Sequence, residues 1–201
     1  MKIDSLETLR GLYAPPTERA VKKEIRALDV HCRRFLELSP FVVLATADKA
    51  GNADASPRGG APGFVKAPDD TTLLIPDAPG NNRLDTLENI LATGRIGLLF
   101  MIPGVDETLR VNGRANLSRD PAEIALCRNE RREPKLVIRV TVEGAYLHCA
   151  KAFLRSGLWK AASQVERSVL PTAGQMIGDQ TGLHTPPETR EEMEKRYAPD
   201  L

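Results

Sequence analysis

The sequence has little that would direct it to a membrane or to nucleic acid. No apolar run approaches the roughly 20 residues that a membrane-spanning helix needs, and residues 1–16 lack the apolar centre of a secretory signal. The formal net charge is only +1 and aromatic residues make up 4% of the chain, so neither a positive field nor a stacking surface favours nucleic-acid binding. We therefore expect a cytoplasmic protein whose binding site is local.

Cysteine is scarce, and glycine-rich phosphate loops are missing. The three cysteines, Cys32, Cys127 and Cys149, are an odd number and lie far apart, which argues against a disulfide framework and against a zinc site. His148 stands beside Cys149, but no third ligand follows at a usable spacing, so we predict no metal site. Neither G-x-G-x-x-G nor G-x-x-x-x-G-K-S/T occurs, which argues against the Rossmann and P-loop nucleotide sites.

The chain does contain enough apolar residues, in a strand-rich pattern, to build one domain over residues 1–201. Hydrophobic residues make up 41% of the sequence. Apolar runs such as 41–47 and 135–150 predict six or seven strands at hairpin spacing, which favours an antiparallel barrel over alternating βαβ units. N-terminal helices are expected over about 5–38, with one amphipathic helix running on from Thr17, and a polar, weakly helical tail over about 165–201.

Three places put an arginine beside glycine or asparagine: "SPRGG" (56–60), "PGNNR" (79–83) and "LRVNGR" (109–114). A guanidinium group next to bare backbone suits a phosphate dianion or the polar edge of a ring. The second place precedes a helix predicted to begin near Leu84, whose N-terminus would add to the attraction for an anion. A turn with a solvated arginine explains any one of the three, so each alone is a weak signal.

The alternation of polar and apolar residues makes the third segment, 109–114, more informative. In "TLRVNGRAN", Arg110, Asn112 and Arg114 fall on one face of a strand and apolar or small residues on the other. Plain solvent exposure explains such a row, and so does a ligand groove at the mouth of a barrel. A further stripe is expected on a helix around "KAFLRSGLW", where Lys151, Arg155 and Trp159 follow one another at steps of four. That stripe fits a surface helix packed on the barrel as well as it fits a ligand contact.

Four segments, in this order, resemble the pyridoxamine 5′-phosphate oxidase-like flavoproteins, and more narrowly their subgroup of FMN-dependent enzymes. The segments are "FVVLATADKAGNADASPRGGAPGFV", "IPDAPGNNRLDTLENIL", "GRIGLLFMIPGVDETLRVNGRA" and "HCAKAFLRSGLW". The likeness runs from about residue 20 to residue 160. It implies a mainly β, α+β fold, a six-stranded antiparallel split β-barrel with flanking helices. It also implies a homodimer with one FMN in each of two clefts at the subunit interface.

The resemblance further implies which residues hold FMN. The implied contacts fall in four groups: Ser56, Pro57, Arg58 and Gly59; Asn82 and Arg83; Arg110 and Asn112; and Lys151, Arg155 and Trp159. Arg58 and Gly59 would lie against the flavin, and Ser56 and Pro57 would present backbone to it. Asn82 and Arg83 would contact the phosphate and ribityl side of FMN. Such a phosphate, with a charge of roughly −2, matches one or two guanidinium groups.

By the same resemblance the protein is an FMN-dependent oxidoreductase of an unknown small molecule, with NADH or NADPH as a candidate electron donor. No side chain stands out as a general acid or base, so we name no catalytic residue, and a flavin-binding or storage module without turnover stays open. A haem-binding split barrel is a third interpretation, for which the axial ligands are few. Oxidation of pyridoxine phosphate is not predicted, because the tryptophan-containing C-terminal substrate segment of that oxidase is not found and "RYAPDL" is only a faint echo of its end.

Overall fold

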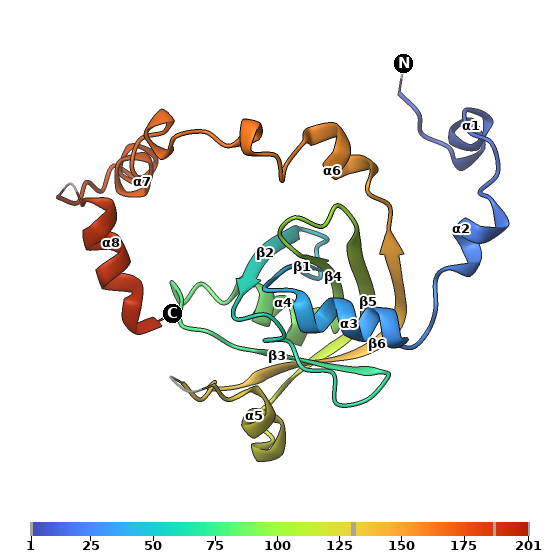
Figure 1. Ribbon diagram of the computed structural model, residues 1–201, viewed down its shortest axis with the longest axis horizontal. Coiled ribbons are helices and arrows are strands. Elements are labelled where there is room, and N and C mark those ends of the chain that lie inside the picture. The colour runs from blue at the N-terminus through green and yellow to red at the C-terminus, as the bar shows by residue number, and fades with distance from the viewer. Residues whose placement is uncertain (1, 130–131, 187, 201) are drawn as a thin grey trace.

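The centre of the computed structural model, which describes residues 2–129, 132–186 and 188–200, is one six-stranded antiparallel sheet. The sheet curls into a half-barrel with helices around it (Figure 1). Its strand order is β2–β1–β4–β5–β6–β3. The strands are β1 (Phe41–Ala47), β2 (Ala53–Gly59), β3 (Thr72–Pro76), β4 (Arg95–Met101), β5 (Thr108–Ser118) and β6 (Val137–His148). This confirms the predicted α+β split barrel.

Eight α-helices and three short 3₁₀ turns lie within the described residues. The helices are α1 (Leu6–Gly11), α2 (Glu18–Lys22), α3 (Val30–Leu38), α4 (Asp85–Thr93), α5 (Pro121–Cys127), α6 (Lys151–Ser156), α7 (Ala173–Thr181) and α8 (Arg190–Tyr197). The turns are η1 (Ala161–Ser163), η2 (Arg167–Val169) and η3 (Ala198–Asp200). None of these helices is long and apolar enough to cross a membrane.

The inner face of the sheet is an aliphatic core. Directly opposed residues on antiparallel strands point to the same face. Leu44 of β1 stands opposite Leu98 of β4, which in turn stands opposite Val111 of β5. All three side chains are buried, and they belong to one continuous core cluster. The period-two pattern of these strands therefore fixes which of their residues form the core.

The outer face of the same strands carries smaller and partly exposed side chains. Ala45 stands opposite Gly97, and Gly97 stands opposite Asn112. The register between β5 and β6 shifts at Asn112 and Gly113, which marks a bulge. A side chain at Gly113 would overlap the carbonyl oxygen of Thr141, so only glycine fits this close approach of two strands. Gly113 itself stands opposite the buried Ile96 and belongs to the inner face. The outer face is shallow because Ala45 and Gly97 place little side-chain bulk at its centre.

The expected continuous helix beyond Thr17 is wrong, because the chain breaks it into α2 and α3. Between them, the backbone N–H of Ile25 donates to the carbonyl of Ala145 at 3.0 Å, and the reverse bond measures 2.7 Å. Asp29 then begins α3 by accepting from the backbone N–H of Cys32 at 2.8 Å. Pairing with the end of β6 thus outweighs the helical periodicity that the sequence shows.

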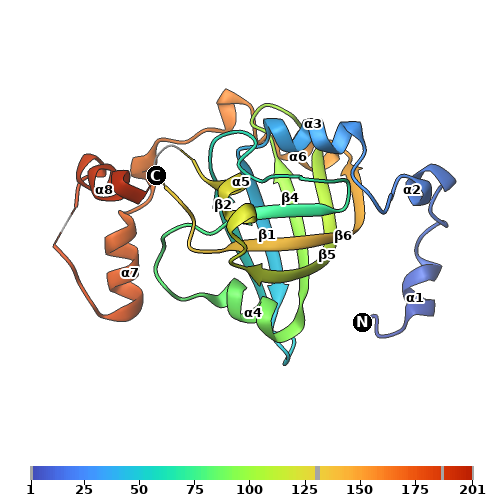
Figure 2. The same cartoon turned by 90° about the horizontal axis from the view of Figure 1, so that it is seen from below.

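The two ends of the chain project from the barrel as arms, residues 2–22 at one end and residues 160–186 and 188–200 at the other (Figures 1 and 2). Helices α1, α2 and α8 bury none of their residues, and α7 buries only Gly178. Side-chain caps and two capping boxes still define these helices locally. The arms are therefore helical by local signals alone, without a core of their own.

Candidate functional site

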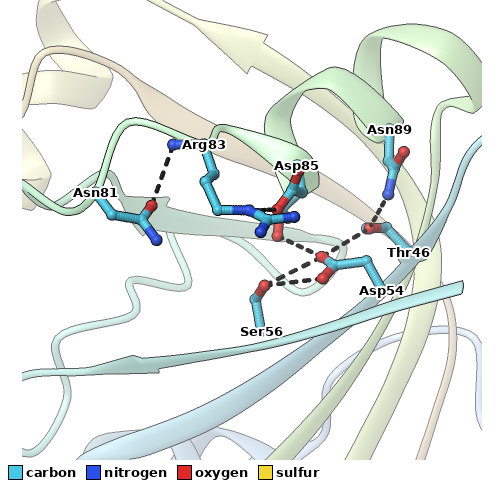
Figure 3. A network of polar contacts seen from close by, with 8 residues as sticks. Thr46, Asp54, Ser56, Asn81, Arg83, Asp85 and Asn89 are labelled. Carbon is cyan, nitrogen blue, oxygen red and sulfur yellow. Dashed lines mark hydrogen bonds and ion pairs between the residues drawn. The ribbon is translucent and has the colours of Figure 1, made fainter. Parts of the chain in front are cut away.

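Ser56 belongs to a network of hydroxyl groups around one carboxylate, between β2 and α4 (Figure 3). The Asp54 carboxylate accepts from the hydroxyl of Thr86 at 2.8 Å and from that of Ser56 at 3.1 and 3.2 Å. The Thr46 hydroxyl reaches it at 3.4 Å and accepts in turn from the Asn89 side chain at 3.1 Å. Both threonines are buried. The edge strand β2 is thus joined to α4 and β1 by polar contacts.

Arg83 lies beside this network, in a loop with strained backbone. Asn82 and Leu84, with φ angles of 59° and 60°, are the only non-glycine residues in the described part of the chain with positive φ. The Asn81 side chain accepts from the backbone N–H of Arg83 at 3.1 Å. Non-glycine residues in the left-handed region cost roughly 1 to 3 kcal/mol each and cluster at ligand-binding segments. The loop therefore has the backbone signature of a binding segment.

The Arg83 guanidinium is available to a ligand but already has a partner. Its side chain is 73% exposed, and its Nε donates to Asp85 at 2.8 Å. That carboxylate raises the pKa of Arg83, with a smaller contribution from Asp54. Asp85 and Glu88 both lie in the first turn of α4, where they reduce the attraction for an anion that we expected from the helix N-terminus. Any phosphate bound here has to compete with Asp85 for the guanidinium.

Arg58 lies further along β2 and opens onto a basic pocket. Its Nη1 donates to the carbonyl of Pro57 at 2.8 Å. The pocket has a volume of about 130 Å³, and three further cations line it, Lys66, Arg128 and Arg132. Among the residues that the structure describes, no carboxylate lines this pocket. This pocket therefore carries a local excess of positive charge, which favours anionic ligands.

Arg110 and Asn112 lie on the outer face of the sheet. Asn112 lines a shallow hollow of about 330 Å³ together with Ala45 and Gly97, whose small side chains leave the space open. The Arg110 guanidinium lies 5.8 Å from the centre of the Tyr146 ring, within cation–π distance. A polar row of this kind, beside a hollow, can orient a ligand or a second chain.

Arg114, the third member of that row, is held by an acidic partner. Its Nε donates to Glu143 at 3.0 Å, and Arg95 donates to the other oxygen of Glu143 at 2.7 Å. Glu143 stands at the bulge between β5 and β6, where no residue of β5 is paired with it. The bulge thus directs one carboxylate toward two arginines, and their charge is partly neutralised.

The predicted stripe on the helix around "KAFLRSGLW" is wrong for its aromatic member. Helix α6 ends at Ser156, and Gly157 follows in the left-handed conformation with φ 61°. Trp159 therefore lies beyond the helix, where its Nε1 donates to the carbonyl of Val105 at 2.9 Å and its ring stacks on Phe153 at 5.4 Å. Tertiary contacts hold this tryptophan against the loop between β4 and β5.

The two cations of that stripe remain on α6. Lys151 and Arg155 are both exposed, and Arg155 donates to the carbonyl of Lys151 at 3.1 Å. Neither side chain has an ion pair with a described residue. They are free to contact a ligand or a second chain.

The register separates the expected contacts into two groups within one chain. Ser56 and Arg58 stand opposite the buried residues Leu44 and Val42, so they share the inner face. Gly59, at the end of β2, stands opposite Phe41, and this register places it, like Pro57, on the outer face. The row of Arg110 and Asn112 also points to the outer face. One chain therefore does not present Arg58 and Arg110 to the same ligand.

Asp54, Thr46 and Thr86 were missed by the sequence prediction. One signal was available for Asp54, which is two residues from Ser56 and therefore on the same face of the strand. The two threonines carry no comparable signal, because α4 and β1 are brought to β2 only by the tertiary fold. No group of three metal-ligating side chains gathers anywhere in the described ranges.

Comparisons with known proteins agree with this geometry at the level of the fold. HupZ of Group A Streptococcus superposes with a TM-score of 0.50 and 18% sequence identity, over 60% of this chain and 93% of HupZ. A single-residue variant of HupZ gives a TM-score of 0.51 at the same identity, over 60% and 99%. An FMN-binding protein from Syntrophomonas wolfei gives 0.44 and 12% identity, over 72% and 97%. No curated protein matches the chain.

The family assignment comes from the sequence profile. The family model described as pyridoxamine 5′-phosphate oxidase matches residues 28–149, which is more than half of the chain. The matched segment begins just before α3 and extends through the last residue of β6, so it contains the whole sheet with both faces of the candidate site. The chain therefore belongs to the pyridoxamine 5′-phosphate oxidase family.

Proposed function

We propose that this protein binds FMN and is an FMN-dependent oxidoreductase of a small molecule. The observation that carries the proposal is that Ser56 and Arg58 share one face of β2 while the exposed Arg83 lies beside the Asp54–Ser56 network (Figure 3), all within the segment that matches the family. An exposed guanidinium in a strained loop suits a phosphate dianion. The second guanidinium, on β2, suits the polar edge of a ring.

The residue types present fit FMN in their chemistry, since exposed guanidinium groups suit its phosphate and the polar edge of its ring. Arg83 and Asn82 would hold the phosphate and ribityl side, and Arg58 with Gly59 would lie against the ring. When bound, the flavin supplies hydride or single-electron transfer, and the protein binds, orients and tunes it. A cation near the pyrimidine edge stabilises negative charge there, which is the contribution we assign to Arg58.

We further propose that the functional unit is a homodimer. The contacts implied for FMN lie on two faces of one sheet, and a second copy can bring the outer-face row of one chain to β2 of the other. The outer face suits such packing because small and apolar residues, among them Ala45, Gly97 and Leu99, leave it flat. Lys151 and Arg155, exposed on α6, are further contacts that a second copy can use.

The first experiment is the absorbance spectrum of the purified protein, followed by denaturation and chromatography of any released chromophore. The expected result is a flavin spectrum and release of FMN at one equivalent per chain. A colourless protein that also fails to take up added FMN would remove the cofactor from the proposal. A haem band in the same spectrum would instead support the haem-binding alternative.

Catalysis is tested separately from cofactor binding. NADH and NADPH are mixed with the FMN-loaded protein, and reduction of the flavin is followed by its absorbance. Turnover with an added acceptor supports the oxidoreductase. A protein that binds FMN but is reduced by neither nucleotide, nor by any other donor tried, is better described as a flavin-binding or storage module. The described hydrogen bonds of the Ser56–Arg83 network involve no histidine or lysine, which favours that second candidate.

A further inference from the structure

The Ser56 hydroxyl has a fixed hydrogen-bonding polarity. A carboxylate has acceptor oxygens only, whereas a serine hydroxyl has one proton to donate and two lone pairs. Ser56 lies 3.1 and 3.2 Å from the two oxygens of Asp54, so the serine must donate in this contact. Its single proton is then committed, and its oxygen can only accept from any other partner.

Asp54 is itself engaged by three hydroxyl groups of the protein. Thr86, held rigid by burial in the first turn of α4, donates to it at 2.8 Å, and Thr46 reaches it at 3.4 Å. Three hydroxyl groups therefore converge on one carboxylate and leave it little capacity for a ligand (Figure 3). Asp54 acts through Ser56, and it is a positioning residue.

This pair lies at the binding segment, because the charge of Asp54 contributes to the environment of the Arg83 guanidinium. Ser56 is only half-buried, and it lies with Arg83 around the same Asp54 network (Figure 3), so its oxygen stays accessible beside the guanidinium group. The Ser56 Oγ atom, next to Arg83, can therefore distinguish a hydrogen-bond donor on the ligand from an acceptor. Arg83 is the residue proposed to hold the phosphate.

We propose that Asp54 makes Ser56 an obligate acceptor, which selects a ligand with a hydrogen-bond donor, an N–H or O–H group, at this point. The inference rests on the proposed function and deepens it. In FMN two sources offer that chemistry, the N3–H of the flavin ring and the hydroxyls of the ribityl chain. Carbonyl and phosphate oxygens, which only accept, are disfavoured beside Ser56.

The test compares FMN with analogues that each lack one donor, 3-methyl-FMN and the 2′-, 3′- and 4′-deoxy forms of the ribityl chain. Fluorescence titration gives a dissociation constant for each with the full-length protein. For the unaltered protein, one analogue is expected to bind about 10-fold more weakly than FMN, the effect of one lost hydrogen bond. The analogue that loses affinity identifies the ring or the ribityl chain as the donor.

Three variants then assign that loss to the pair. Ser56→Ala removes the acceptor, and it is expected to reduce the discrimination to less than about 2-fold. Ser56→Thr keeps the hydroxyl and should retain it. Asp54→Asn should also abolish the discrimination, because its amide can donate to Ser56 and release the serine proton toward the ligand. Asp48→Asn, in the turn between β1 and β2, is the matched control for a substitution that alters the hairpin without touching the network.

The outcomes separate this inference from the proposed function. If the protein binds FMN but distinguishes none of the analogues, or if Ser56→Ala and Asp54→Asn discriminate as the unaltered protein does, the inference is overturned while FMN binding stands. If the unaltered protein binds no FMN, the proposed function fails and the inference falls with it. Serine and threonine at position 56 are expected to discriminate alike and alanine is not, a difference in binding selectivity that a merely structural role for Asp54 would not produce.

Discussion

The two faces of the sheet differ in what covers them, although the same strands form both. Leu44, Leu98 and Val111 are buried on the inner face, and their neighbours Ala45, Gly97 and Asn112 are left partly open on the outer face. The arms do not fill that difference, because α1, α2 and α8 bury nothing. A strand can therefore serve stability with one set of side chains and remain available for binding with the other.

The largest expected effect comes from the inner face. Leu44→Ala should lower the free energy of unfolding by about 2 to 5 kcal/mol, because it leaves a cavity in a packed core. Chemical denaturation with a linear extrapolation measures this. Val43→Ala, one residue away on the outer face, is the matched control and should cost clearly less. Equal losses for the two variants would contradict the distinction between the faces.

A substitution on the outer face is expected to weaken association of two chains and not folding. Leu99→Asp places a charge opposite Val43, at the centre of the surface proposed for the dimer, and is expected to weaken dimerisation by roughly 100-fold, about 3 kcal/mol. Sedimentation over a range of concentrations gives the dissociation constant. Leu91→Asp, on the exposed side of α4, is the control for adding a charge. A Leu99→Asp protein that stays as dimeric as the control would exclude this face as the interface.

A substitution at the exposed Arg83 tests the loop before α4 without disturbing the core. Arg83→Ala should weaken FMN binding by about 1.5 kcal/mol or more, roughly 10-fold, if its guanidinium holds the phosphate. A fluorescence titration measures the change. Arg34→Ala removes an exposed, ion-paired arginine of α3 and should leave FMN affinity unaltered. An unchanged dissociation constant for Arg83→Ala would remove this residue from the site.

The smallest expected effect is at the cysteines. Burial raises the pKa of the Cys32 and Cys127 thiols to about 11 in each case, whereas Cys149 is exposed. The folded state holds these two protons more tightly than the unfolded chain, so their contribution to stability is complete below about pH 9 and declines toward pH 11. Thiol labelling of the native protein at pH 8 should modify Cys149 first. Equally rapid labelling of all three would contradict the burial.

The fold followed from the sequence because strand and turn signals are local. The alternating runs and the apolar strand at 41–47 predicted six or seven strands in an antiparallel barrel, and the family resemblance implied six. The helix expected beyond Thr17 failed, since Ile25 pairs with Ala145 across the fold and no local pattern records that contact. The placement of Trp159 on the helix was wrong for a local reason, because Gly157 ends α6 before the spacing of four can continue.

The site was predictable in its residue types and less so in its arrangement. Alternation correctly placed Arg110 and Asn112 on one face of β5, but only the register with β4 and β1 shows that Ser56 lies on the other face. The role of Asp54 depends on Thr86, which α4 brings to β2 from a distant part of the sequence. Contacts between distant segments of this kind are set by tertiary packing, and the sequence of one strand does not reveal them.

The division of the polar residues between two faces of one sheet has a thermodynamic consequence for the proposed dimer. If each FMN contacts both copies, binding and assembly are reciprocal, and FMN tightens the dimer by the same factor by which the dimer tightens FMN. By mass action, the apparent affinity for FMN then depends on the concentration of the protein itself. Dilution alone would release the flavin, and a reported affinity would have meaning only together with the protein concentration at which it was measured.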